Sequence, residues 1–85
     1  MDIYWSPSAL RDYHYWKIND EKKTEKIKDL LRNIQESPYQ GLGKPEALKY
    51  DKRGLWSRRI NLEHRLVYYI SERGIEVVSC RYHYE

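Results

Sequence analysis

The chain has 85 residues, a formal net charge of +3 and a single cysteine. This length accommodates one small domain, residues 1–85, and one cysteine excludes an internal disulfide and fits a reducing compartment. No apolar run is long enough to cross a bilayer, and the first residues lack the basic and apolar regions of a signal peptide. We therefore expect a soluble cytoplasmic protein that does not contact a membrane.

The first residues of the chain predict a strand followed by a helix. Residues 2–5 are rich in β-forming side chains and predict a short strand. Ser6 can cap a helix and Pro7 fits the first helical position, where its missing N–H group is not needed. The apolar residues that follow form one face through about Ile18, so a first helix is expected there.

A second helix is predicted between Asp20, a candidate cap, and Ser37-Pro38. Its apolar residues recur with helical spacing: Ile27, Leu30, Leu31 and Ile34. Several lysines lie around the rest of its surface. A solvated face is the simpler interpretation of these lysines, and direct contact with RNA is the alternative.

The remainder of the chain predicts strands. After a loop rich in glycine and proline, extended segments are expected near 46–51, 55–61, 65–70 and 75–82. The short connections allow hairpins but not helical crossovers, so these segments should form a largely antiparallel meander. The predicted fold class is α+β: a short N-terminal strand, two helices and a four-stranded meander, in one sheet with the helices on one face.

Strand alternation divides the predicted side chains between the two faces of this sheet. Two sets are expected against the helices: Leu66, Tyr68 and Ile70, and Val78, Cys80 and Tyr82. The open face then receives Arg65, Arg81 and His83, together with Ser57, Arg59 and Asn61. Arg58 would lie on the helix side with Trp56 and Ile60. Glu46 and Lys49 have opposite parity, so both reach one cleft only if their strand starts late or contains a bulge.

The second half of the chain also holds most of the positive charge. Residues 1–40 carry seven basic and seven acidic side chains, whereas residues 41–85 carry nine basic and six acidic ones. Nine tyrosines and three tryptophans are spread along the chain. A basic half with interleaved aromatic rings favours a polyanionic partner, most often nucleic acid, and an ordinary solvated surface explains the charge equally well.

Four short blocks occur in order along the chain: Gly-Leu-Gly-Lys-Pro-Glu-Ala-Leu-Lys (41–49), Trp-Ser-Arg-Arg-Ile (56–60), His-Arg-Leu-Val-Tyr (64–68) and Cys-Arg-Tyr-His-Tyr (80–84). Together they resemble the YoeB (Txe/YoeB) toxins, a branch of the RelE superfamily of bacterial type II toxin–antitoxin systems. The resemblance implies a RelE-like small ribonuclease fold. It also implies an enzyme without cofactor or metal, a ribosome-dependent endoribonuclease that cleaves mRNA in the A site and inhibits translation.

The resemblance further implies partners and site residues. The expected partners are mRNA and the ribosome, a YefM-like acidic antitoxin, and a second copy of the chain in a homodimer. The expected catalytic set comprises Glu46 as general base, His83 as general acid and Arg65 at the transition state. The expected substrate contacts are Lys49, Arg59 and Tyr84.

These residue types suit cleavage of RNA by its own 2′-hydroxyl. A glutamate is ordinarily ionised at neutral pH and can act as base, and a histidine, with an ordinary pKa near ~6.5, keeps a useful protonated fraction. Arginine forks match phosphate oxygens. The scattered histidines and the one cysteine match no metal-ligand spacing, so no metal is expected.

Other roles remain open on the sequence alone. A non-catalytic toxin could act by binding, through occupancy of the A site or inhibition of DNA gyrase. Arg65 could form a cross-strand ion pair with Glu63 or Glu76 instead of a phosphate contact. His64 and His14 are interpreted as structural residues, and Cys80 as a small buried apolar side chain.

Overall fold

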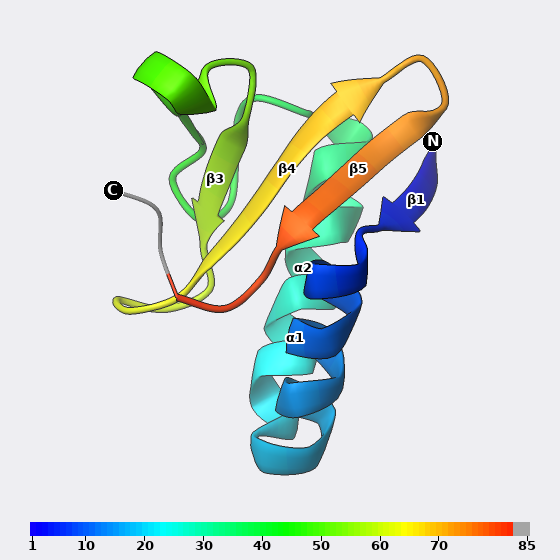
Figure 1. Ribbon diagram of the computed structural model, residues 1–85, viewed down its shortest axis with the longest axis vertical. Helices are drawn as coiled ribbons and strands as arrows, with labels where there is room; N and C mark the ends of the chain where they lie inside the picture. Colours follow the sequence, from blue (N-terminus) through cyan, green and yellow to red (C-terminus); the bar gives the residue numbers. More distant parts are fainter. Residues whose placement is uncertain (83–85) are drawn as a thin grey trace.

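The computed structural model describes residues 1–82, so the expectations for His83 and Tyr84 lie outside the described residues. The elements in chain order are β1 (Asp2–Trp5), α1 (Pro7–Asn19), α2 (Glu21–Glu36), β2 (Glu46–Ala47), the 3₁₀ helix η1 (Tyr50–Lys52), β3 (Trp56–Arg59), β4 (Arg65–Ser71) and β5 (Gly74–Ser79). The strands form one five-stranded sheet in the order β1-β5-β4-β3-β2, and both helices lie on one side of it (Figure 1). The predicted α+β class is confirmed.

The sheet is a meander with one parallel edge strand. β2, β3, β4 and β5 pair antiparallel in sequence order, as predicted, and β1 pairs with β5 in parallel. β2 is shorter than the predicted segment 46–51, because Tyr50 adopts a left-handed backbone conformation, φ 58°, and the chain turns into η1. The last strand likewise ends at Ser79, earlier than predicted.

The starts of the two helices differ in how they are capped. The Ser6 hydroxyl accepts a hydrogen bond from the Ala9 amide at 3.0 Å, with Pro7 in the first turn, as the sequence predicted. Asp20 precedes α2 but its side chain makes no capping bond. Its carboxylate instead pairs with the Lys23 ammonium at 2.7 Å, and this hydrogen bond lowers the pKa of Asp20.

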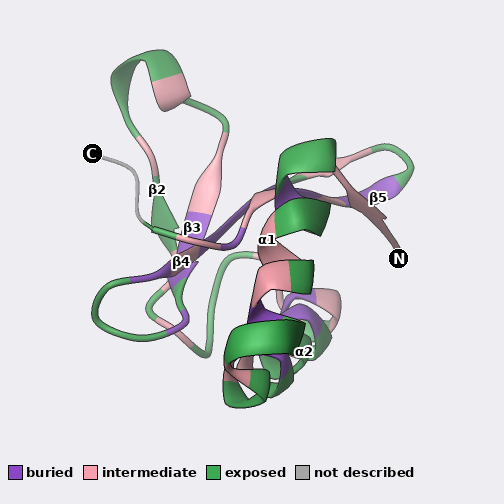
Figure 2. Cartoon of the chain, turned by 60° about the horizontal axis from the view of Figure 1, so that its bottom comes forward, coloured by how far each residue is buried: buried purple, intermediate pink, exposed green. Residues whose placement is uncertain are grey.

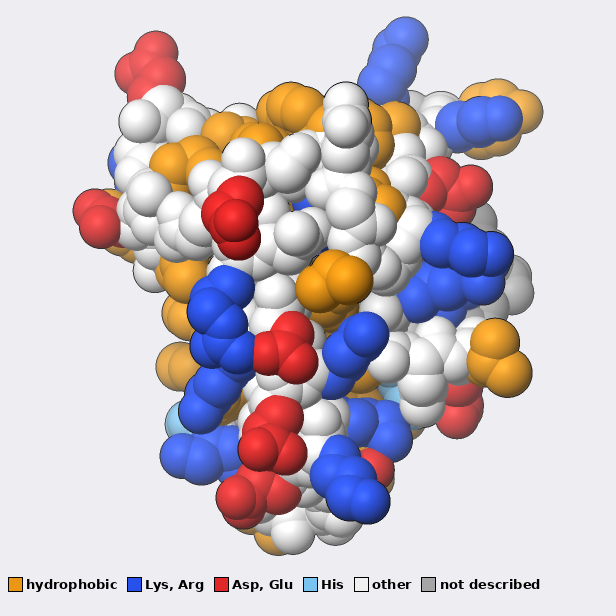
Figure 3. All heavy atoms as spheres, turned by 180° about the vertical axis from the view of Figure 1, so that it is seen from behind, with side chains coloured by type: hydrophobic (Ala, Val, Ile, Leu, Met, Phe, Trp, Pro, Cys, Tyr) orange, Lys and Arg blue, Asp and Glu red, His pale blue; other side chains and the backbone are white. Residues whose placement is uncertain are grey.

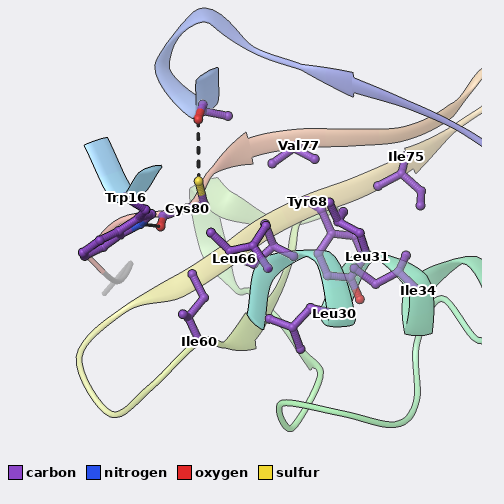
Figure 4. Packing of buried hydrophobic residues seen from close by; sticks show 12 residues of the cluster. Trp16, Leu30, Leu31, Ile34, Ile60, Leu66, Tyr68, Ile75, Val77 and Cys80 are labelled. Carbon is purple, nitrogen blue, oxygen red and sulfur yellow. Dashed lines mark hydrogen bonds between the residues drawn. The ribbon is translucent and has the colours of Figure 1, made fainter. Parts of the chain in front are cut away.

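The core lies between the helices and the sheet (Figures 2 and 4). Its fully or nearly fully buried members come from every layer: Ala9, Trp16, Ile27, Leu30, Leu31, Ile34, Ile60, Leu66, Tyr68, Ile75, Val77 and Cys80. The indole of Trp16 donates to the Cys80 carbonyl oxygen at 2.8 Å, so its polar tip is satisfied inside the core. Cys80 is a buried apolar side chain, as expected.

A β-bulge in β5 overturns part of the predicted alternation. Tyr68 pairs with Val77 and Val67 with Ser79, so Val78 is an extra residue without a partner on β4. Val77, and not Val78, therefore faces the helices, and the added residue returns Cys80 to the same side. The predicted packing of Leu66 and Tyr68 against the helices is confirmed.

The residues beyond β5 also differ from the prediction, because strand alternation no longer applies after Ser79. The guanidinium carbon of Arg81 lies 3.5 Å from the centroid of the Tyr15 ring on α1, so Arg81 does not face the open side. Tyr82 is 57% exposed and does not pack in the core.

The outer surface of the helices carries charges of both signs. Figure 3, seen from behind Figure 1, shows blue and red side chains interspersed over the helical half of the molecule. Lys23 pairs with Asp20 and Arg32 with Asp29, each within one turn. This arrangement agrees with the solvated-face interpretation of the α2 lysines. Within residues 1–82, neither helix has the length and apolar character needed to cross a bilayer.

Candidate functional site

A pocket of about 190 Å³ brings together residues from three separate segments. It is lined by Lys44, Pro45, Glu46, Ser57, Arg59 and Arg65. Three of the six site residues predicted from the sequence, Glu46, Arg59 and Arg65, therefore meet in one hollow. These are one carboxylate and two guanidinium groups, the combination expected for acid–base chemistry on a phosphate.

Sheet register explains why these side chains converge. Glu46 on β2 is the direct partner of Ser57 on β3, and Arg59 on β3 is the direct partner of Arg65 on β4. Antiparallel partners project to the same face, and residues two apart on one strand do so as well. The whole set therefore lies on the face away from the helices, as predicted for Ser57, Arg59 and Arg65.

A buried arginine holds the loop that delivers Glu46 to the pocket. Arg58 is completely buried on the helix side of β3, as predicted. Its guanidinium donates to the carbonyl oxygens of Ser37 at 2.7 Å, Gln40 at 2.9 Å and Leu42 at 3.1 Å. It also donates to the side chain of Asn33 and to the Tyr68 hydroxyl. Oxygens from one loop and its flanking elements thus surround a single cation.

Gly43 brings the same loop against β3. Its carbonyl oxygen accepts the Arg59 amide at 2.7 Å, and its φ of 79° is in the left-handed region. A Cβ at this position would lie 3.0 Å from the Arg59 carbonyl oxygen and 2.9 Å from Leu30 Cδ2. Glycine is therefore required here both for the backbone conformation and for the close approach. The sequence predicted a turn in this loop, but it did not predict that Arg58 would donate hydrogen bonds to the carbonyl oxygens of the loop.

The two arginines of the pocket carry uncompensated positive charge. Within residues 1–82, neither Arg59 nor Arg65 forms an ion pair with a carboxylate. Arg65 donates to the carbonyl oxygens of Asn61 at 3.2 Å and Leu62 at 3.3 Å, which orients its guanidinium without neutralising it. Two guanidinium groups beside a hollow, one of them oriented by carbonyl oxygens, suit the binding of an anion such as phosphate.

The alternative ion pairs considered for Arg65 are not formed. Glu63 lies beside His64, with Oε1 3.5 Å from Nε2, and Glu76 pairs with Arg73 at 2.7 Å. Hydrogen bonds from Arg73 and Ser71 lower the pKa of Glu76 to about 2. Both carboxylates are therefore engaged elsewhere, and Arg65 remains available to the pocket.

Lys49 lies in an adjoining pocket and does not line the one that holds the arginines. This second hollow, of about 320 Å³, is lined by the consecutive residues 46–52. It shares Glu46 with the smaller pocket, so this residue borders both. The parity argument assumed a strand over 46–51, but β2 ends at Ala47, so strand alternation does not extend to Lys49.

Tyr82, the residue before His83, is held by hydrogen bonds beside the start of β4, the strand that carries Arg65. The Arg65 amide donates to the Tyr82 carbonyl oxygen at 2.8 Å, and the Tyr82 amide donates to His64 Nδ1 at 2.7 Å. His64 was predicted only as a structural residue, and its place beside the C-terminal segment was not visible in the sequence. Among residues 1–82, no three His, Cys, Asp or Glu side chains are grouped so that they could hold a metal ion.

Known proteins resemble this chain over its full length. The family model for the YoeB-like toxin of bacterial type II toxin–antitoxin systems matches residues 5–84. Toxin YoeB of Escherichia coli K12 is 43% identical over 84 residues, which are 99% of this chain and 100% of that protein.

Solved structures agree with this match. The YoeB/ParE toxin from Agrobacterium tumefaciens is 50% identical with a TM-score of 0.95, covering 99% of this chain and 100% of that one. YoeB from Staphylococcus aureus, solved as a dimer and in a complex with YefM, is 47% and 46% identical with TM-scores of 0.93 and 0.91. Each covers 99% of this chain and 98% of that one. The chain therefore belongs to the YoeB-like toxins of bacterial type II toxin–antitoxin systems.

Proposed function

We propose that this toxin is a ribosome-dependent endoribonuclease that cleaves mRNA in the A site and so inhibits translation in the cytoplasm. The observation that carries the proposal is the convergence of Glu46, Arg59 and Arg65 in one pocket on the open face of the sheet. A carboxylate beside two arginines that form no ion pair within residues 1–82 matches the requirements of RNA cleavage, and the family resemblance indicates the substrate.

In the proposed reaction the RNA supplies its own nucleophile. Glu46 removes the proton of a 2′-hydroxyl, whose oxygen attacks the adjacent phosphorus atom. The bond from phosphorus to the 5′-oxygen breaks, and His83 donates a proton to that oxygen. The products are a 2′,3′-cyclic phosphate and a 5′-hydroxyl end, so atoms and charge balance without a metal.

The cations act on the pentacoordinate phosphorane. Arg59 and Arg65 line the pocket, and two carbonyl oxygens orient Arg65, so we propose that their donors stabilise the negative charge that develops on the equatorial oxygens. Preorganised donors of this kind contribute roughly 3–4 kcal/mol each in comparable sites. Lys49, in the adjoining pocket, is proposed to contact the neighbouring phosphate, and Tyr84 to stack on a base.

The family also suggests how the toxin is controlled. The Staphylococcus aureus relative was solved in a complex with YefM and as a dimer. We extend both to this chain: a YefM-like acidic antitoxin would neutralise the basic site, and the toxin would form a homodimer. An acidic segment is complementary in charge to a pocket lined by Lys44, Arg59 and Arg65.

The experiment that tests the proposal uses purified ribosomes stalled on a defined message. Primer extension after addition of the toxin should reveal a cut within the A-site codon, and the same message without ribosomes should remain intact or be cut far more slowly. Glu46→Gln should reduce the rate by about 10²–10⁴-fold, the usual contribution of a general base. Arrested translation with an intact message would instead indicate a toxin that acts by occupancy.

A further inference from the structure

The imidazole of His64 is held rigidly at the start of β4, the strand that carries Arg65. His64 directly precedes β4 and is 7% exposed. Its ring packs edge-on against Trp16 of α1, with the two centroids 4.7 Å apart, and its Nε2 lies 3.5 Å from the Glu63 carboxylate. A ring fixed by a helix on one side and a loop on the other cannot reorient freely.

His64 and Arg65 together form hydrogen bonds with both the amide and the carbonyl oxygen of Tyr82. Nδ1 of His64 accepts the Tyr82 amide at 2.7 Å, and the Arg65 amide donates to the Tyr82 carbonyl oxygen at 2.8 Å. Because the Tyr82 amide is the donor, Nδ1 is the unprotonated nitrogen of the ring. Tyr82 has a φ of 62°, so these two bonds hold a left-handed turn that ordinary strand pairing would not produce.

We propose that His64 is a positioning residue of the nuclease site, which fixes the backbone of Tyr82 and thereby the point from which the chain continues to His83. This inference rests on the proposed function, in which His83 is the general acid. These two hydrogen bonds, the clamp on Tyr82, hold Tyr82 next to Arg65, whose side chain lines the pocket. A general acid must hold its geometry to within a fraction of an ångström, and a displacement of about 1 Å costs on the order of 10²-fold in rate.

Two substitutions separate this role from simple packing. In His64→Asn the side-chain amide oxygen falls close to the place of Nδ1, whereas in His64→Gln it reaches the place of Nε2. Both variants lose the ring contact with Trp16, so they should lose similar stability in urea unfolding. They differ chiefly in whether an acceptor faces the Tyr82 amide.

The expected result is a split between the two variants. His64→Asn should cleave mRNA on the ribosome within about tenfold of the wild type, and His64→Gln should lose about 10²-fold in kcat. The KM should change little in either, because neither substitution removes a phosphate contact. Equal cleavage by the two variants at equal stability would overturn the proposal.

Hydrogen exchange at the Tyr82 amide gives a second readout that needs no enzyme activity. This amide should be protected in the wild type and in His64→Asn, and should exchange much faster in His64→Gln. Protection in all three would overturn the proposal. If the wild type leaves the message intact while exchange follows the expected order, the nuclease proposal fails and the clamp on Tyr82 stands.

Discussion

Arg59 and Arg65 stand directly opposite each other on β3 and β4. Like charges at such positions destabilise a sheet, by about 0.2–1 kcal/mol for an exposed pair. Within residues 1–82 no carboxylate pairs with either of them, and Arg65 is oriented by two carbonyl oxygens. This cross-strand pair of like charges is therefore suited to binding an anion such as phosphate.

Replacing one member of this pair should separate function from stability. Arg59→Gln removes the repulsion, so the free energy of unfolding should stay equal or rise by up to ~1 kcal/mol. Cleavage of mRNA on the ribosome should fall by about 10²–10³-fold, the usual effect of losing one transition-state donor. Arg32→Gln, on the exposed face of α2, is the matched control and should change neither quantity much. A marked loss of stability in Arg59→Gln would show that the residue has a structural role.

Substitution of Arg58, in contrast to that of Arg59, should lower the stability of the fold. Arg58→Met removes the buried guanidinium that donates to the partly buried carbonyl oxygens of Ser37, Gln40 and Leu42. The expected loss is about 3–5 kcal/mol in urea unfolding, as for other buried charged networks that lose one partner. Arg58→Lys should also be destabilised, since one ammonium group cannot reach all of these oxygens. A loss under ~1 kcal/mol in Arg58→Met would refute the role of Arg58 in holding the loop.

The alternation of Trp56, Arg58 and Ile60 was enough to predict that Arg58 lies on the helix side. Helix boundaries could also be predicted, because Ser6-Pro7 and Ser37-Pro38 act through local backbone chemistry. The bulge at Val78 could not, since one unpaired residue in a strand leaves no trace in composition or periodicity. Long-range geometry decides such a shift, and the sequence records only short-range preference.

The candidate site was predictable to a similar extent. Strand alternation was enough to predict that Arg59 and Arg65 lie on the open face. Glu46 could be placed beside them only once the register of β2 against β3 was known. Lys49 could not be assigned to a pocket from the sequence, because β2 ends at Ala47 and strand alternation does not extend to Lys49. The proposed role of His64 depends on its hydrogen bond with Tyr82, which lies 18 residues away in the sequence, and no motif predicts this bond.

Glu76 should contribute to stability in a defined pH range. Its pKa is lowered from 4.5 to about 2, first by the hydrogen bond from Arg73 and then by that from Ser71. A lowered folded-state pKa means that the contribution is complete above pH 4.5 and is lost as the pH falls toward 2. The stability difference between the wild type and Glu76→Gln should therefore shrink over this range in pH-dependent urea unfolding. A difference that stays constant would contradict the assignment.

Cys80 should be inert in the folded protein. Burial, and then the nearby Asp12 carboxylate, raise the pKa of its thiol to about 12, so almost no thiolate exists near neutral pH. Alkylation should be at least ~100-fold slower in the native protein than in guanidinium, because it requires an opening of the core. Rapid modification of the native protein, without unfolding, would contradict the burial of Cys80.

If the pocket catalyses attack by the RNA's own 2′-hydroxyl, a single substituted nucleotide in the message should prevent cleavage. A ribosome-bound message with one 2′-deoxyribose at the mapped cleavage position has no nucleophile there. This message should stay intact, whereas the all-ribose message should yield a 2′,3′-cyclic phosphate end in a Glu46-dependent reaction. Cleavage of the deoxy-substituted message at the same bond would show that the 2′-hydroxyl is not the nucleophile.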